Sequence, residues 1–297
     1  MPEFRIAELS EIRLRRPEAI AEAAASRRRP SSVADLGPLM VIAADHGARG
    51  ALRAGRRPLA MGDRRELLER LCLALSRPGV NGVLGTPDVI EDLLLLGVLD
   101  DKAVFGSMNR GGLAGATWEL DDRFTAYDAA SIERSGFEGG KMLTRIDLGN
   151  AATAPTVEAC SRAVSELAER RLIAMVEPFM ARSADGKVKT ELTTEAAIKA
   201  SAISAGLGTT SAYTWLKVPV VDDMEAVAAA TTLPTVLLGG EVREDMDAYF
   251  ETWRSALAVP NVVGMVVGRS LLYPADDDVA AAVDTVVGLF PNAPVTP

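Results

Sequence analysis

Lys217 lies inside an otherwise apolar, β-prone run of residues from Tyr213 to Val221. Burying an ammonium without a partner is unfavourable, and it lowers the pKa of the amine below its usual value of about 10.4. An uncharged lysine amine is a nucleophile for carbonyl groups. The alternative is a lysine at a strand end whose stem packs while its charged head reaches solvent. The rest of the chain favours the nucleophile.

Lysine is scarce in this chain, and a second one lies in a strand-like segment. Only six of the 32 basic residues are lysines, so a lysine in a strand indicates that an amine is needed where a guanidinium would not serve. Lys141 and Lys217 both meet this condition, and a second cation nearby lowers the pKa of the first. Glu177 lies between them in sequence and offers a carboxylate for proton transfer. The alternative for Lys141 and Glu177 is a salt bridge in the core.

From Pro38 onward the chain repeats a short apolar run, a turn rich in Gly, Asp or Asn, and an amphipathic helix. The runs recur about every 32 residues, which is the length of a βα unit. Because the runs are continuously apolar, both faces of each strand must be covered, and this indicates parallel strands with crossover helices. The predicted strands are residues 39–44, 82–85, 103–107, 140–146, 172–176, 214–218, 235–238 and 262–267.

Eight such units predict an α/β fold, a (β/α)8 TIM barrel that occupies residues 37–297. Residues 1–36 are rich in Ala, Arg and Glu and are expected to form an N-terminal helical extension. The alternative fold is a doubly wound open sheet, but no G-x-G-x-x-G follows the first predicted strand to support it.

The carboxyl ends of barrel strands are where catalytic groups gather. The last two of these ends carry Gly239-Gly240 and Gly268-Arg269. Glycines let backbone N–H groups approach an anion closely, and an arginine adds a positive charge. We therefore predict a phosphate site at these two loops. The polar residues at all the predicted ends are Asp45, His46, Thr86, Asp88, Ser107, Asn109, Arg110, Lys141, Arg145, Asp147, Glu177, Lys217, Glu241, Arg269 and Ser270.

Composition excludes several kinds of partner and site. With 41 acidic and 32 basic residues, a net charge of -9 and a pI near 4.9, the chain is not expected to bind nucleic acid or an anionic membrane. A single histidine rules out a zinc site built on several histidines, and no G-x-S-x-G is present for a serine triad. Two cysteines without a C-x-x-C, and no signal peptide, predict a cytoplasmic protein. Its helical extension and barrel edges are expected to make a homo-oligomer.

The order of the motifs along the strands resembles one barrel superfamily. It is the class I, Schiff-base aldolase superfamily of deoxyribose-phosphate aldolase, bacterial tagatose-bisphosphate aldolase and archaeal-type fructose-bisphosphate aldolase, and the resemblance spans residues 38–275. Relatives often have Asp-Gln-Arg-Gly or Asp-His-Gly-Val in the first motif, and the strand-5 tyrosine of the archaeal type has no counterpart here. The residues that carry the resemblance are Asp45-His46-Gly47-Ala48-Arg49-Gly50, Lys141, Val176-Glu177-Pro178, Trp215-Leu216-Lys217-Val218 and the two glycine loops.

This resemblance implies a function and a role for each site residue. Lys217 would form the Schiff base, Lys141 and Glu177 would match the tagatose-bisphosphate branch, and Asp45 would match the aspartate that closes strand 1. The implied enzyme is a metal-independent aldolase without a cofactor, acting on a phosphorylated keto-sugar or keto-sugar acid. The preferred substrate is 6-phospho-5-dehydro-2-deoxy-gluconate of inositol catabolism, with fructose bisphosphate, tagatose bisphosphate and deoxyribose phosphate as alternatives.

Two interpretations from other classes are kept. The first is a metal-dependent barrel lyase in which Asp45, Asp147 and Glu177 bind magnesium. The second is a non-catalytic barrel that binds a sugar phosphate and serves as a sensor or an assembly partner. The metal-dependent lyase would lose activity in a chelator. The non-catalytic barrel would bind a ketose phosphate tightly but form no covalent adduct with it under borohydride reduction.

Overall fold

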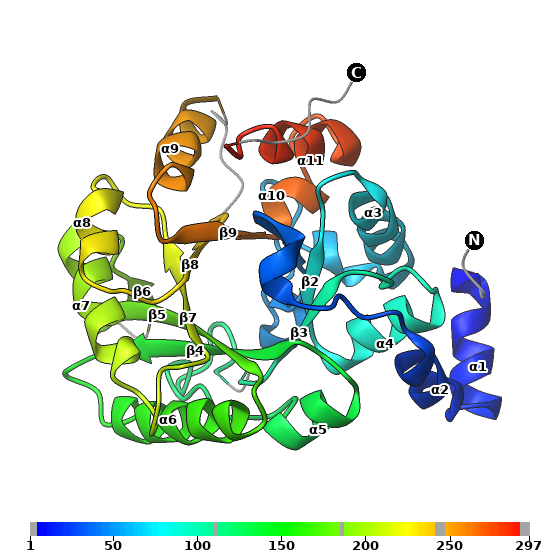
Figure 1. Cartoon of the computed structure of the whole chain (residues 1–297), viewed down its shortest axis with the longest axis horizontal. Coiled ribbons are helices and arrows are strands. Elements are labelled where there is room, and N and C mark those ends of the chain that lie inside the picture. The colour runs from blue at the N-terminus through cyan, green and yellow to red at the C-terminus, as the bar shows by residue number, and fades with distance from the viewer. Residues whose placement is uncertain (1–4, 110–111, 185–186, 241–246, 292–297) are drawn as a thin grey trace.

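The computed structural model describes residues 5–109, 112–184, 187–240 and 247–291. Within these ranges, eight parallel strands close into one barrel, and the predicted (β/α)8 fold is confirmed. Figure 1 shows the helices arranged around these strands. The strands are β1 (Leu39–Ala43), β2 (Gly82–Gly85), β3 (Ala103–Ser107), β4 (Gly139–Ile146), β5 (Ile173–Ala184), β7 (Thr214–Pro219), β8 (Thr235–Leu238) and β9 (Val262–Val267).

The covering helices form because each carries one apolar stripe and a suitable start. At the start of α3 (Arg64–Ser76), the Asp63 side chain accepts the backbone N–H of Glu66 at 3.0 Å and so caps the first turn. Among the described residues, none of the helices combines the length and apolar character that spanning a bilayer requires. The helices after β1 are α3 (Arg64–Ser76), α4 (Pro87–Leu95), α5 (Ala129–Arg134), α6 (Thr153–Glu169), α7 (Thr194–Ala205), α8 (Met224–Ala229), α9 (Asp247–Leu257), α10 (Arg269–Leu272) and α11 (Val279–Val287).

The two largest apolar clusters of the barrel lie on opposite sides of the strands, because successive side chains of a strand point to opposite faces. In β1, Met40 and Ile42 join the larger core between strands and helices, whereas Leu39, Val41 and Ala43 join the core inside the barrel. All five are buried, which explains why the strand reads as a continuous apolar run. The next residue whose side chain points to the same side as the inner core is Asp45, two positions beyond Ala43.

The fifth strand is longer than the sequence predicted. β5 runs from Ile173 to Ala184, and its end pairs antiparallel with β6 (Lys187–Thr190). The predicted strand stopped at Val176 because Glu177-Pro178 has the composition of a strand end. Pro178 is accommodated in the sheet opposite Thr144 of β4. A short hairpin therefore extends the sheet beyond the residues that close the barrel.

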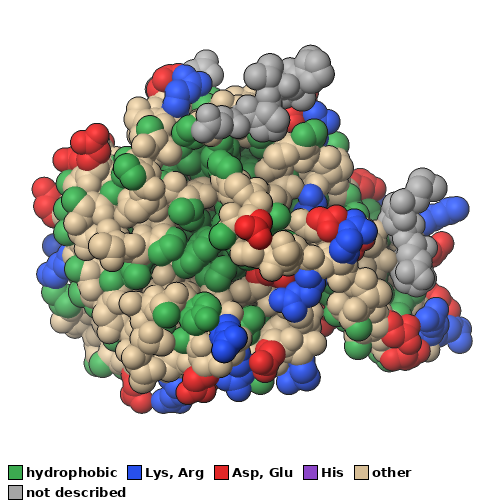
Figure 2. Space-filling view, in the orientation of Figure 1, with side chains coloured by type: hydrophobic (Ala, Val, Ile, Leu, Met, Phe, Trp, Pro, Cys, Tyr) green, Lys and Arg blue, Asp and Glu red, His purple; other side chains and the backbone are tan. Residues whose placement is uncertain are grey.

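An N-terminal helical extension precedes the barrel, as predicted. It contains η1 (Ile6–Glu8), α1 (Leu9–Arg15), α2 (Ala19–Ser26) and η2 (Val33–Leu36). Figure 1 places α1 and α2 beside α4, and Arg13 of α1 pairs with Asp92 of α4 at 2.8 Å. Figure 2 shows acidic and basic side chains mixed over this corner of the molecule. Val33 and Leu36 of η2 pack against the inner core, so the extension covers one end of the barrel.

Candidate active site

Four buried charged side chains form one layer inside the barrel, next to its inner apolar core. One follows β1 and the others lie within β4, β5 and β7. They are Asp45, Lys141, Glu177 and Lys217, the four residues predicted as catalytic. Because side chains alternate between the two faces of a strand, every second residue points into the barrel, and these four do so. Three of them follow inner-core residues by two positions: Asp45 follows Ala43, Glu177 follows Met175, and Lys217 follows Trp215.

These side chains form one chain of close contacts across the barrel. Lys217 Nζ donates to Glu177 Oε1 at 2.6 Å, and Lys141 Nζ donates to Glu177 Oε2 at 2.6 Å. Lys141 Nζ also lies 2.8 Å from Asp45 Oδ2. The structure therefore brings all four predicted residues together, with positive and negative groups in alternation. The core salt bridge that was the alternative for Lys141 and Glu177 is present as well, within this larger arrangement.

Ser107 belongs to the same layer and was not among the predicted site residues. Its hydroxyl donates to Asp45 Oδ2 at 3.1 Å, and its side chain is fully buried at the end of β3. The signal that could have identified it is its position two residues after the inner-core residue Phe105. A serine is common in any strand end, so its type alone carried no such signal.

The electrostatics of the layer favour an ionised carboxylate beside an amine that loses its proton readily. Burial raises the pKa of Glu177, but the charges of Lys141 and Lys217 outweigh burial and lower that pKa to about 2. Burial lowers the pKa of the Lys217 amine, and it outweighs the opposing attraction of Glu177. The charge of Lys141 lowers the pKa of Lys217 further. Lys217 is thus closer to its nucleophilic form than an exposed lysine is.

The carboxylates proposed for a magnesium site do not converge. Asp45 and Glu177 face the ammonium of Lys141, at 2.8 and 2.6 Å. Asp147 instead accepts the backbone N–H of Gly149 at 3.0 Å and of Ser183 at 2.7 Å. It joins the turn after β4 to the β5–β6 hairpin. Among the residues that the structure describes, no three His, Cys, Asp or Glu side chains are grouped so as to hold a metal ion.

The predicted phosphate loops follow β8 and β9, which are adjacent strands of the barrel. Gly240 has a φ of +65°, a conformation that favours glycine. Gly268 precedes α10, and a Cβ added there would lie 2.4 Å from the carbonyl oxygen of Ala43. The Arg269 Nη1 donates to the carbonyl oxygen of Arg53 at 3.2 Å. The structure thus brings Gly239-Gly240 and Gly268-Arg269 to the same end of the barrel, while Arg110 and Glu241 lie outside the described residues.

A second charged cluster holds the connection between β3 and α5 at the same end of the barrel. Arg145 of β4 donates to both carboxylate oxygens of Asp122, at 2.8 and 2.7 Å. It also donates to Glu119 Oε1 at 3.2 Å, and this oxygen accepts from Arg49 at 3.3 Å. Arg49 donates in addition to the carbonyl oxygen of Gly112 at 2.8 Å. The cluster fixes the loop around the predicted site, and no pattern in the sequence indicated this pairing.

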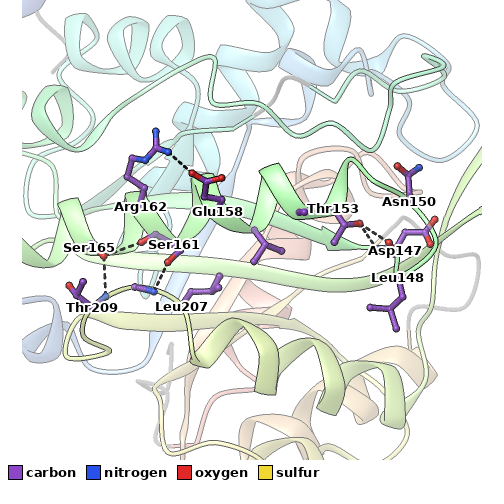
Figure 3. Close-up of a pocket in the computed structure, with 13 residues that line it drawn as sticks. Asp147, Leu148, Asn150, Thr153, Glu158, Ser161, Arg162, Ser165, Leu207 and Thr209 are labelled. Carbon is purple, nitrogen blue, oxygen red and sulfur yellow. Dashed lines mark hydrogen bonds and ion pairs between the residues drawn. The ribbon is translucent and has the colours of Figure 1, made fainter.

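A groove of about 830 Å³ lies outside the barrel along α6 (Figure 3). Its polar groups serve the fold: Ser161 Oγ accepts the N–H of Gly208 at 3.0 Å, and Ser165 Oγ accepts that of Thr209 at 3.0 Å. None of the four buried charged residues lines this groove. The candidate site is therefore the charged layer inside the barrel.

Comparison with known proteins places the chain in a family. Residues 37–287 match the family described as Cgl0159-like. The chain belongs to the Cgl0159-like family. The crystal structure of Cgl0159 from Corynebacterium glutamicum is 51% identical in sequence, covers 97% of this chain and 98% of its own, and superposes with a TM-score of 0.92. No curated protein matches the chain.

Other solved structures share the barrel of this Cgl0159-like protein at low identity. A fructose-1,6-bisphosphate aldolase described as Schiff-base-forming is 17% identical, with a TM-score of 0.65, covering 92% of this chain and 100% of its own. An archaeal fructose-1,6-bisphosphate aldolase, whose catalytic lysine is bound to a carbinolamine intermediate, is 17% identical, with a TM-score of 0.64 and coverages of 91% and 98%. These likenesses establish that the fold is that of class I aldolase barrels.

Proposed function

We propose that the protein is a class I aldolase in which Lys217 forms a Schiff base with the ketone of a phosphorylated keto-sugar or keto-sugar acid. The observation that carries this proposal is the pair of buried lysines that flank one carboxylate, with Lys141 and Lys217 each 2.6 Å from Glu177. A buried lysine whose pKa is lowered, as that of Lys217 is, is suited to Schiff-base chemistry. The enzyme is then an aldehyde-lyase that breaks or forms a carbon–carbon bond.

Formation of the imine begins with a proton transfer from Lys217 to Glu177, across 2.6 Å. The neutral amine attacks the ketone carbon, and the former carbonyl oxygen takes a proton from the attacking nitrogen to become a hydroxyl. Glu177 returns its proton to that hydroxyl, which leaves as water. A protonated imine on Lys217 then stands opposite the ionised carboxylate, so the charges in the layer are the same as at the start.

Cleavage uses the protonated imine as an electron sink. A base accepts the proton of the β-hydroxyl, the bond between the α and β carbons breaks, and the aldehyde fragment departs. The bonding electrons stay on the fragment attached to Lys217 as an enamine, which is protonated and hydrolysed. Glu177 or Asp45 is the base, and Lys141, which contacts both, carries protons between them.

The phosphate of the substrate binds at Gly239-Gly240 and Gly268-Arg269 in this proposal. The adjacency of β8 and β9 supports it, because backbone N–H groups from both loops can converge on one anion. Binding energy from a group remote from the reacting bond orients the reacting carbons against the amine. A phosphorylated substrate would therefore gain in turnover as well as in affinity.

The substrate set follows from this chemistry and from the resemblance in the sequence. Three members carry a ketone: 6-phospho-5-dehydro-2-deoxy-gluconate, fructose 1,6-bisphosphate and tagatose 1,6-bisphosphate. The fourth, deoxyribose 5-phosphate, comes from the resemblance alone and would form the imine through its aldehyde. The two low-identity barrels described above are fructose-bisphosphate aldolases, so fructose 1,6-bisphosphate is tested first. The inositol-derived gluconate is tested beside it as the substrate expected from the sequence.

Borohydride reduction with each candidate, followed by peptide mass mapping, tests the proposal. The expected result is a reduced adduct on Lys217 in the wild type and none there in Lys217→Met, with the exposed Lys189→Ala as a matched control that labels normally. Activity should persist in a metal chelator. An adduct on Lys141 alone would reverse the assigned roles. Tight binding of a ketose phosphate without any adduct would instead support the non-catalytic barrel.

A further inference from the structure

His46, the chain's only histidine, lies between two parts of the proposed site. It begins the short turn η3 (His46–Arg49) directly after Asp45. Its Nδ1 lies 3.9 Å from Asp45 Oδ1, while Asp45 Oδ2 lies 2.8 Å from the Lys141 ammonium. The His46 side chain is 22% exposed, unlike the fully enclosed Lys141. The imidazole therefore adjoins the charged layer and also reaches solvent.

The same ring packs on the glycine loop that follows β9. A Cβ added to Gly268 would lie 2.8 Å from His46 Cε1, so the ring rests directly against this glycine. Because Cε1 is bonded to both ring nitrogens, both nitrogens lie near the loop. The next residue, Arg269, supplies a guanidinium whose Nη1 donates to the carbonyl oxygen of Arg53. Two basic side chains thus adjoin one glycine of the predicted phosphate loop.

The chemistry of an imidazole at this place suits an anion. An imidazole donates at least one N–H whether it is neutral or protonated. Hydrogen bonds to an ionised acceptor are stronger than those between neutral groups. A ring that only filled space beside Gly268 would give a bound phosphate no hydrogen bond, so its replacement would not weaken the binding of a phosphorylated substrate, and the two roles can be told apart by experiment.

We propose that His46 is a substrate-binding residue that contacts the phosphate held at Gly268-Arg269 and selects phosphorylated over unphosphorylated keto-sugars. This inference rests on the proposed function. Because His46 also adjoins Asp45, it connects the occupied phosphate loop to the Asp45–Lys141 pair.

The single histidine makes a direct test feasible, because the untagged protein has one set of imidazole proton resonances. Inorganic phosphate is titrated into the protein at fixed pH and ionic strength. A titration with chloride in place of phosphate is the control. The expected result is a saturable shift of the His46 resonances with phosphate and no shift with chloride, in the wild type and in Lys217→Met. An absent shift, or an equal shift with both anions, would overturn the assignment.

The outcome of this titration is independent of imine formation. Borohydride labelling of Lys217 without a phosphate-dependent shift would leave the aldolase proposal standing and remove the role of His46. A saturable shift without labelling of Lys217 would support the anion contact while the aldolase proposal fails. The two proposals therefore cannot be confused.

A kinetic test uses His46→Gln and, as a second variant in case the first folds poorly, His46→Asn. With a ketose phosphate that labels Lys217, KM should rise about tenfold while kcat changes little, since a lost hydrogen bond to an ionised group is of that size. The unphosphorylated keto-sugar should be handled as by the wild type. Equal losses for both substrates would assign His46 a structural role only.

Discussion

The amine of Lys217 and the carboxylate of Glu177 are 2.6 Å apart inside the barrel mouth, and both side chains are buried. Neither group would be stable there alone, because a buried charge needs a partner. The contact lowers the pKa of Glu177, and burial lowers the pKa of Lys217 in spite of it. The pair is therefore stable as a salt bridge, while burial keeps Lys217 closer to its neutral form than an exposed lysine is.

Glu177→Gln should lower both stability and turnover. The substitution leaves Lys141 and Lys217 without the carboxylate between them, and breaking a buried pair costs about 3–5 kcal/mol in the free energy of unfolding. Loss of the proton acceptor should reduce kcat by about a hundredfold or more. Urea denaturation and steady-state kinetics measure the two effects. Glu191→Gln, at the exposed Arg182 pair, is the matched control and should change neither appreciably.

Acid should unfold the protein partly through Glu177. Its pKa in the folded state, about 2, lies below its ordinary value of 4.5, so the folded state binds fewer protons than the unfolded state between these two values. The stability that Glu177 contributes is then fully present above about pH 4.5 and is lost as the pH falls towards 2. Urea denaturation between pH 6 and pH 3 should show a steeper decline for the wild type than for Glu177→Gln. Parallel declines would contradict this pKa shift.

The strands of the barrel could be predicted because parallel strands covered on both faces need apolar residues at nearly every position. Once the strands are located, the alternation of side chains places Lys217 and Glu177 inside the barrel, and their types indicate the chemistry. The same rule applies to Ser107, but a serine has no distinctive chemistry until its contact with Asp45 is known. The site residues whose types are unusual in a strand, Lys217 and Glu177, could thus be predicted, whereas Ser107 could not.

Features that depend on loop conformation could not be predicted. Arg145 and Asp122 are 23 positions apart, and their pairing requires the particular path of the β3–α5 connection. The β5–β6 hairpin was missed because Glu177-Pro178 has the composition of a strand end, and the short, polar β6 has no apolar run. Local pattern predicts elements well, whereas contacts between distant loop residues require the folded chain.

Arg145→Lys should loosen the loop between β3 and α5. Arg145 donates through two nitrogens to Asp122, and a lysine has no planar fork with which to replace both bonds. Because both side chains are buried, we expect a loss of about 1–3 kcal/mol in the free energy of unfolding. Faster hydrogen exchange in residues 112–128 should accompany it. Arg123→Lys, whose exposed side chain pairs with the half-buried Asp121 in the same loop, should leave exchange unchanged.

Arg27→Met should show that the N-terminal extension is required for the stability of the barrel. Arg27 is buried and donates to Glu138 at 3.0 Å and to the carbonyl oxygens of Lys102 and Gly136. Glu138 accepts in turn the backbone N–H of Val104 in β3. Removing Arg27 deprives a buried carboxylate of its buried partner, which costs about 3–5 kcal/mol in the free energy of unfolding.

Arg28→Met is the control for this effect, because Arg28 is exposed and pairs with the exposed Asp101. Surface pairs of this kind contribute about 0–1 kcal/mol, so the two neighbouring substitutions should differ several-fold in urea denaturation. Equal, small effects would indicate that the extension only rests on the barrel. A large effect confined to Arg27→Met would mean that residues 5–36 and the strands unfold together, because η2 also packs against the inner core through Val33 and Leu36.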